Sequence, residues 1–195
     1  MLHRYRDIHT HLPQGADSIY SVPVSGVEEV RKHNLEVSMA YCQPYSLQLH
    51  PWHLSYVAEI ASFEAKAKCL ADDPLFVAVG ECGLDALCDT PLPLQHEAFL
   101  SALRVAKALH RPVIVHCVRL WDAMMRDVKQ IFTHEECLQL PVIVHGFRKG
   151  PQLAQQLLNA GFSISLGLHY NEATRAIIPA ERLFFETDNN IENKT

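Results

Sequence analysis

Short runs of β-branched and aromatic residues alternate along this chain with longer segments of helical periodicity. Eight runs have the composition of buried strands: Arg6–His11, Ile19–Pro23, Ser46–His50, Phe76–Glu81, Pro112–His116, Pro141–His145, Phe162–Leu166 and Leu183–Asp188. Four intervening segments place apolar residues at core-facing helical spacing: Leu54–Ala71, Gln95–His110, Arg119–Phe132 and Gln152–Ala160. Strands that alternate with helices form parallel βαβ units, so the sequence predicts an α/β fold, a TIM-type (β/α)8 barrel.

The predicted barrel is abbreviated. The chain has 195 residues, whereas a (β/α)8 barrel usually needs about 250. Gly26–Asn34 leaves room for only a turn or two of helix after the second strand, and residues 189–195 are too few for a closing helix. We therefore expect a single domain over residues 1–195 that lacks a full C-terminal helix. An open doubly wound parallel sheet is the alternative.

Composition limits where the protein works and what it binds. Six cysteines are scattered without a CxxC or a tight cluster, which indicates reduced thiols and a cytoplasmic location. The N-terminus, MLHRYRDIHTHL, has no apolar stretch for a signal peptide, and no run is long enough to span a membrane. A formal net charge of −5 gives no chain-wide attraction for nucleic acid, so any phosphate binding must be local.

Five of the eight predicted strands carry candidate metal ligands, imidazoles or carboxylates, at their C-terminal ends. The residues are His9, His11, Glu81, His116, His145 and Asp188. In an α/β barrel the strand C-termini converge on one mouth, so these side chains are expected to meet there. They exceed what one zinc-type centre needs, which favours two metal ions bridged by a carboxylate. A single histidine after a strand is more often solvated or hydrogen-bonded than a ligand, but four histidines and two carboxylates at equivalent ends of five strands favour metal binding.

One pentapeptide, Pro-Val-Ile-Val-His, occurs twice, at 112–116 and 141–145. Val and Ile suit a buried strand, but folding alone does not explain why both runs stop at histidine. We interpret the two segments as successive barrel strands that each deliver one imidazole to a shared metal site.

Seven ordered stretches carry a family resemblance. They are DIHTHL at 7–12, LQLHPW at 47–52, VGECGLD at 79–85, QHEAF at 95–99, PVIVHC at 112–117, VIVHGF at 142–147 and FFETD at 184–188. Together they resemble the motifs of the TatD family of metal-dependent hydrolases, in the short form of that family. The resemblance implies a TIM barrel of the amidohydrolase-like type, two divalent metal ions, and DNA exonuclease or general phosphodiester hydrolysis as the activity.

The resemblance also implies roles for single residues. His9, His11 and Asp188 would hold one metal, His116 and His145 the other, and Glu81 would bridge them. The family usually continues past its Glu-Thr-Asp motif with Ser-Pro and a further helical segment, whereas this chain reads ETDNNIENKT. That departure removes no ligand. It concerns the parts that would supply loops for a long nucleic acid.

The predicted chemistry uses a water molecule activated by two divalent ions, with Zn, Mn, Mg or Fe as candidates. Glu81 and Asp188 are the predicted catalytic residues, and Asp188 also takes the proton of the attacking water. Arg119, Arg148 and Lys149 follow two of the ligand-bearing strands, and all three are candidates for holding phosphate oxygens or are solvated loop charges. His50 is either a contact to the site or the substrate, or a packed histidine.

Three functions fit these residues. The first is a divalent-metal-dependent phosphodiesterase or deoxyribonuclease acting on DNA or a small phosphodiester, with a single-stranded substrate favoured over duplex DNA by the acidic charge. The second is an amidohydrolase-type enzyme cleaving an amide, ester or lactone at the same two-metal site. The third is a non-enzymatic descendant with a structural metal site. The sequence leaves the oligomeric state open and is compatible with a monomer.

Overall fold

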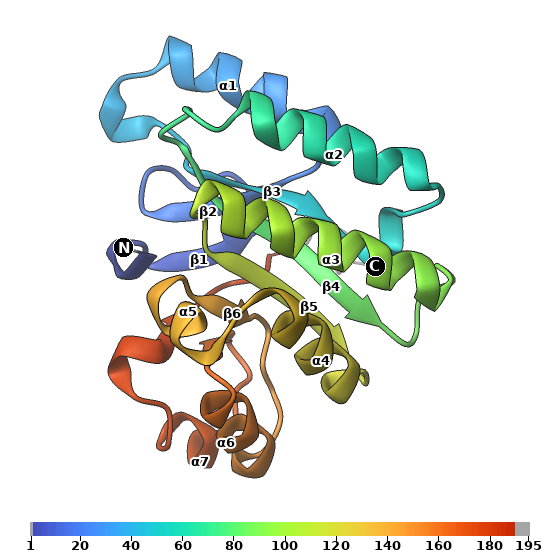
Figure 1. Ribbon diagram of the computed structural model, residues 1–195. Helices are drawn as coiled ribbons and strands as arrows, with labels where there is room; N and C mark the ends of the chain where they lie inside the picture. Colours follow the sequence, from blue (N-terminus) through green and yellow to red (C-terminus); the bar gives the residue numbers. More distant parts are fainter. Residues whose placement is uncertain (1, 190–195) are drawn as a thin grey trace.

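The structure, a computed structural model, describes residues 2–189 and contains one sheet of eight parallel strands (Figure 1). The strands are β1 Asp7–Thr10, β2 Ser18–Val22, β3 Tyr45–Leu49, β4 Phe76–Asp85, β5 Val113–Val118, β6 Val142–Val144, β7 Ser163–Leu166 and β8 Leu183–Phe185. Each strand pairs with the next along the chain, and β8 lies beside β1. This sequential order is that of a (β/α)8 barrel and excludes a doubly wound sheet, whose strand order reverses.

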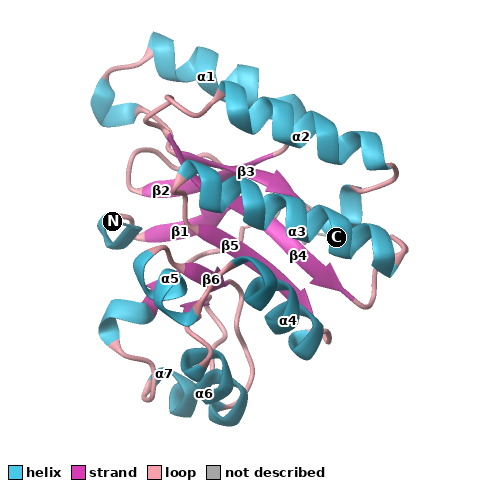
Figure 2. Ribbon diagram, viewed as in Figure 1, coloured by secondary structure: helices cyan, strands magenta, loops and turns pink. Residues whose placement is uncertain are grey.

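Helices lie along the outside of the strands (Figure 2). They are α1 Val27–Glu36, α2 Val57–Cys69, α3 Leu92–Leu109, α4 Trp121–Ile131, α5 His134–Gln139, α6 Pro151–Asn159 and α7 Glu172–Arg175. Short 3-10 turns occur at Leu2–Arg4, Val24–Gly26, Met39–Tyr41, Pro51–His53 and Ala180–Arg182. Within residues 2–189, every helix is too short or too polar to cross a bilayer.

Two helices differ from the prediction. α1 has 10 residues, almost three turns, so the expectation of only a turn or two was wrong. α5 was not predicted, although its start carries a capping box: the Glu136 N–H donates to Thr133 Oγ1 at 3.2 Å, and the Thr133 N–H donates to Glu136 Oε2 at 2.8 Å. The spacing Thr-x-x-Glu at 133–136 could therefore have predicted the start of α5.

The barrel interior is filled by one side chain from each of six strands. This layer contains Ile8, Ile19, Ala78, Ile114, Ile143 and Phe184, none more than 4% exposed. The valines on either side of Ile114 and Ile143 face outward and pack in the helix-covered core, because side chains alternate along a strand. His116 and His145 follow each inward isoleucine by two residues, so both strands direct their histidine into the barrel mouth.

The junction between β8 and β1 closes without a regular ladder in residues 2–189. The backbone beyond β8 makes the connection instead: the Asp188 N–H donates to the His9 carbonyl at 3.1 Å, and the His11 N–H donates to the Asn189 carbonyl at 3.2 Å. The bond between Asp188 and His9 joins the two segments predicted as the last and first strands, although β8 itself ends at Phe185. Phe185 in β8 is 42% exposed, so part of the outer face of this strand is uncovered. The predicted lack of a full C-terminal helix concerns residues that lie largely outside those described.

Candidate metal centre

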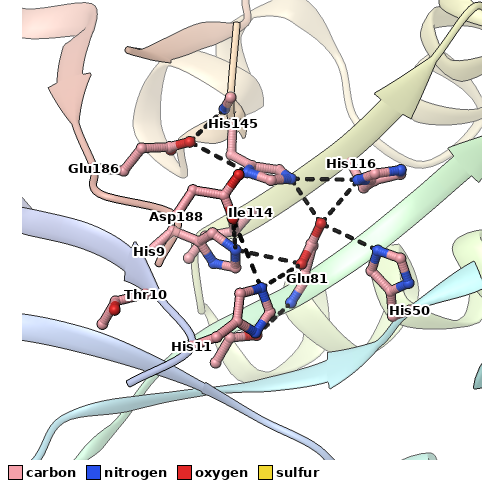
Figure 3. Close-up of polar contacts among 12 residues, drawn as sticks. His9, Thr10, His11, His50, Glu81, Ile114, His116, His145, Glu186 and Asp188 are labelled. Carbon is pink, nitrogen blue, oxygen red and sulfur yellow. Dashed lines mark hydrogen bonds and ion pairs between the residues drawn. The ribbon is translucent and has the colours of Figure 1, made fainter. Parts of the chain in front are cut away.

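All six predicted ligands converge at the carboxyl ends of the strands, with Glu81 at their centre (Figure 3). The two oxygens of Glu81 face different histidines. Oε2 lies 3.3 Å from His9 Nε2 and 3.4 Å from His11 Nε2. Oε1 lies 2.8 Å from His116 Nδ1 and 2.7 Å from His145 Nε2. The carboxylate therefore stands between two pairs of imidazoles.

Two glycines in β4 allow Glu81 to reach this position. The register of β4 against both neighbouring strands shifts between Val79 and Cys82, and Gly80 and Gly83 have φ of +134° and +148°. A Cβ at Gly83 would lie 1.9 Å from the His116 carbonyl oxygen, a distance that no side chain tolerates. β4 can therefore approach β5 closely enough to aim Glu81 into the site only because glycine occupies these positions.

Asp188 reaches the site from the chain that follows β8, three residues beyond the end of that strand. Its Oδ1 lies 3.7 Å from His9 Nε2 and 3.8 Å from His11 Nε2. The residue has a φ of +48°, a left-handed conformation that Asp adopts more readily than most residues. Thr187 anchors this segment, because its Oγ1 donates to Asp7 Oδ2 at 2.5 Å. The Asp188 side chain is 32% exposed, so it faces both the other ligands and the solvent.

Charge is concentrated around Glu81. Burial opposes its ionisation, but the charges of His145 and His9 outweigh burial and hold the pKa of Glu81 well below its usual value. Burial also opposes a charged His145, yet Glu81 and Glu186 raise the pKa of His145 well above the usual value. The site thus favours a negative carboxylate surrounded by positive charge, which is the environment that a divalent cation supplies.

His9 provides the strongest test of whether these residues fit a metal ion. Its side chain is fully buried, and neither imidazole nitrogen has a hydrogen-bond partner. A buried polar atom without a partner is costly, so His9 Nε2 beside Glu81 and Asp188 is explained by a shared ion that takes its lone pair. Nitrogen and carboxylate oxygen ligands suit Zn, Mn or Fe, and Mg with additional waters. The residues therefore fit a divalent metal.

The ligand atoms form three overlapping groups, each within 4.8 Å: His9, His145 and Asp188; His9, His11 and Glu81; and His50, Glu81 and His116. His145 thus lies close to His9 and Asp188 as well as to Glu81, and His50 enters the cluster beside Glu81. In His50 the Nδ1 atom accepts the Trp52 N–H at 3.1 Å, and the Nε2 atom lies 3.2 Å from Glu81 Oε1. Burial lowers the pKa of His50, so the ring is neutral and donates from Nε2 to Glu81.

Two carboxylates that the sequence analysis missed orient the histidines. Asp85 Oδ2 lies 3.0 Å from His116 Nε2, and Glu186 Oε1 lies 3.3 Å from His145 Nδ1 and accepts the Gly146 N–H at 2.6 Å. Each carboxylate thus contacts the ring nitrogen that points away from Glu81. Such partners fix the tautomer and orientation of a ligand histidine. The sequence did contain a signal for Glu186, because this carboxylate precedes the predicted ligand Asp188 by only two residues.

Both missed carboxylates are ionised more readily than an ordinary side chain. Burial raises the pKa of Asp85, but hydrogen bonds from His116 and from the Leu87 backbone bring it below the usual value. Burial likewise opposes ionisation of Glu186, and the charge of His145 more than compensates, so its pKa is also lowered. Each histidine therefore faces a negative carboxylate on its outer nitrogen.

A cleft of about 390 Å³ opens beside the cluster. Its walls include His116, His145 and Asp188 from the site, together with the three predicted cations Arg119, Arg148 and Lys149. Within residues 2–189 none of these three cations is paired with a carboxylate. The structure thus brings all three beside the ligands, with their charges available to an anion.

Comparison with known proteins places this site in context. The model of the family described as TatD related DNase matches residues 7–191. The 3'-5' ssDNA/RNA exonuclease TatD of Cronobacter turicensis is 36% identical over 135 residues, covering 64% of this chain and 49% of that protein. This chain therefore spans about half the length of that relative. The uncharacterized metal-dependent hydrolase YjjV of Escherichia coli is 29% identical, with 96% of this chain and 80% of the relative covered.

The solved structures support the fold. The crystal structure of YjjV, a TatD homologue from Escherichia coli, superposes with a TM-score of 0.74 at 24% identity, covering 96% of this chain and 80% of that chain. A TatD-family hydrolase from Entamoeba histolytica superposes with a TM-score of 0.71 at 18% identity, covering 95% and 73%.

Proposed function

Because the chain belongs to the TatD related DNase family, we propose that it is a divalent-metal-dependent hydrolase that cleaves phosphodiester bonds of single-stranded nucleic acid. The observation that carries this proposal is the convergence of five candidate ligand side chains around Glu81, beside a cleft whose cations have no carboxylate partner within residues 2–189. The Cronobacter relative is named as an exonuclease on single-stranded DNA and RNA, which supports the same substrate class here. Residues 1–195 would act as one hydrolase domain.

We assign His9, His11 and Asp188 to one ion, His116 and His145 to the other, and Glu81 to both. The geometry of Glu81 supports this division, since one oxygen faces His9 and His11 and the other faces the remaining pair. Burial opposes ionisation of Glu81, but the charges of His145 and His9 lower its pKa and keep the carboxylate ionised near neutral pH.

Two divalent ions bound there would supply a water molecule of lowered pKa and would neutralise charge on the phosphate. The side chains of this protein perform the remaining tasks. Asp188 lines the cleft and is part-exposed, so it can accept the proton of the attacking water. Arg119, Arg148 and Lys149 would hold the non-bridging phosphate oxygens and stabilise the charge that grows in the transition state.

The cleft favours a phosphodiester over an amide or neutral ester, because the three cations around it, which lack a carboxylate partner in the described part of the chain, match an anionic substrate. The net charge of −5 provides no wider basic surface for duplex DNA, so we propose a single-stranded or short substrate. We also propose a cytoplasmic location, since all six cysteines are free thiols.

Substrate preference is the test of this function. Protein reconstituted separately with Zn, Mn, Mg or Fe is incubated with single-stranded DNA, duplex DNA, bis-p-nitrophenyl phosphate and simple carboxylic esters. We expect hydrolysis of the phosphodiesters, fastest for single-stranded DNA, and none of the esters. Turnover of esters without any phosphodiester would establish the amidohydrolase-type activity instead, and no turnover with bound metal would establish a structural metal site.

A further inference from the structure

An exposed tryptophan lies at the edge of the metal centre and has no part in the mechanism above. Trp52 is 54% exposed and belongs to the 3-10 turn Pro51–His53, directly after His50. An indole buries more apolar surface than most side chains when it packs, so leaving half of it in water forgoes stabilisation. Its position suggests a role outside the core.

The indole is held firmly in spite of its exposure. Its Nε1–H donates to Asp85 Oδ2 at 2.7 Å, the same oxygen that lies 3.0 Å from His116 Nε2. The ring centroid is 5.1 Å from that of His50 and 6.1 Å from that of His116, in both cases edge to face. Trp52 is therefore positioned relative to the metal ligands by a nearly buried carboxylate.

Asp85 also anchors a second exposed apolar side chain. Its Oδ1 accepts the Leu87 N–H at 2.7 Å, and Leu87 is 63% exposed and lines the cleft that contains Arg119 and Arg148. One carboxylate thus holds an exposed leucine in the wall of the cationic cleft and an exposed indole beside His116, which lines the same cleft. Proteins that bind single strands without sequence preference combine these two elements, a basic groove for the backbone and aromatic side chains for the bases.

We propose that Trp52 is a stacking platform for a nucleobase adjacent to the scissile phosphate, with Leu87 packing against the same nucleotide. Asp85 is the positioning residue that orients the indole. The proposal rests on the proposed function, because it assumes a nucleic-acid substrate. Every base offers a π face, so the platform would select nucleic acid over base-free phosphodiesters without preferring a sequence.

Fluorescence tests the contact directly, because the chain has only two tryptophans, Trp52 and Trp121. In the Trp121→Phe variant the remaining emission comes from Trp52. Titration with the oligonucleotide (dT)8 in EDTA, which prevents cleavage, is expected to quench this emission as stacking forms. Binding is followed in parallel by the anisotropy of fluorescein-labelled (dT)8. No quenching across a titration in which anisotropy shows binding would overturn the proposal, and so would no binding at all.

Affinity distinguishes stacking from a structural effect on the site. Trp52→Ala is expected to weaken (dT)8 binding roughly 5- to 150-fold, the loss usual for one stacked base. An abasic eight-nucleotide strand should bind the variant and the wild type equally, and metal content should not change. Trp52→Phe keeps a stacking ring without the indole N–H, so its loss should be smaller. Equal weakening on both strands, or none on (dT)8, would overturn the proposal.

These readouts separate the platform from the activity on which it rests. Quenching and base-dependent affinity are measured without metal or turnover. If they appear but metal-loaded protein hydrolyses no nucleic acid, the proposed function fails and the platform stands. If hydrolysis occurs and Trp52 responds to neither measurement, the proposed function stands and the platform fails.

Discussion

The same five residues, at 112–116 and 141–145, span β5 and β6, yet the histidines that follow Val115 and Val144 meet the site in opposite orientations. His116 turns Nδ1 toward Glu81 at 2.8 Å and Nε2 toward Asp85 at 3.0 Å. His145 turns Nε2 toward Glu81 at 2.7 Å and Nδ1 toward Glu186 at 3.3 Å. Identical local sequence therefore does not determine which nitrogen faces the ions. The outer carboxylate does, and in each case it comes from another part of the chain.

The two strands also continue differently. β5 runs two residues past His116 to Val118 and pairs there with β4, whereas β6 ends at Val144 and the chain turns at Gly146, with φ of +57°. Both histidines are nevertheless followed three residues later by an arginine that lines the cleft. The strand supplies the ligand, and the surrounding segments set its orientation and the position of the cation.

Removing the partner that both histidines share should have the largest effect. Glu81→Ala deletes the proposed bridge, so we expect metal stoichiometry to fall and hydrolysis to drop by more than about 100-fold, beyond the usual effect of an outer partner. Elemental analysis and turnover on single-stranded DNA provide the measurement. His134→Ala, outside the cluster, is the matched control and should change neither. Full metal content and normal turnover in the Glu81 variant would contradict the bridging assignment.

Asp85 and Glu186, the carboxylates that contact His116 and His145 on the side away from Glu81, can be replaced separately to compare the two histidines. Asp85→Asn and Glu186→Gln keep the side-chain shape but exchange a negative acceptor for an amide, so each should weaken metal binding about 10- to 100-fold. Calorimetric titration of metal-free protein measures the affinity and stoichiometry of each step. Both variants should affect the same ion, because we assign His116 and His145 to one metal.

The double variant decides between two ligand assignments. If His116 and His145 share an ion, Asp85→Asn combined with Glu186→Gln should still bind one ion per chain with nearly unchanged affinity. His145 also lies in a group with His9 and Asp188, and in that arrangement the double variant would weaken both ions. Loss of both high-affinity steps would therefore require His145 to be reassigned.

The sequence analysis found the strands and the converging side chains because both depend on local signals. Val-Ile-Val followed by His indicates a buried strand with a ligand at its end, and the barrel brings such ends together. Asp85 was missed because the predicted strand stopped at Glu81, whereas β4 continues to Asp85. That extension depends on pairing with β5 through Gly83, a contact with a distant segment that no local pattern reveals.

Glu186 and His50 illustrate a second limit. Glu186 lay inside the predicted strand, but its role follows from contact with His145, 41 residues away in the chain. His50 was assigned either to the site or to packing, and only its distances to Glu81 and Trp52 show that it donates into the cluster. Likewise, the segment beyond β8 is held to β1 by the Asp7–Thr187 hydrogen bond, which joins residues 180 positions apart. Interactions of this range are set by the whole fold.

The arginines that follow the two histidines should have smaller effects. Arg148→Ala is expected to raise KM or lower kcat about tenfold for a phosphodiester, which is typical of losing one hydrogen bond to a charged group, without altering metal content. Arg119→Ala should behave similarly if the two segments contribute equally. Steady-state kinetics on single-stranded DNA give the answer. Unaltered kinetics would identify the arginine concerned as a solvated loop charge.

The smallest effect is expected where the two segments are most alike. Ile114 and Ile143 are register partners across β5 and β6, both fully buried in the inner layer of the barrel. Ile→Val at either position removes one methylene, so each variant should lose about 0.5–1.5 kcal/mol of unfolding free energy, with similar values at the two sites. Urea denaturation of metal-free protein measures this loss, and metal affinity should stay unchanged.

The double variant Ile114→Val/Ile143→Val tests whether the two strands act as one packed unit. The methylenes belong to side chains in contact, so the combined cost is expected to differ from the sum of the single costs, as neighbouring sites usually do. Strict additivity would mean that each isoleucine packs independently. A much larger cost at one position would show that the two strands, although they share the sequence Val-Ile-Val, differ in the core as well as at the mouth.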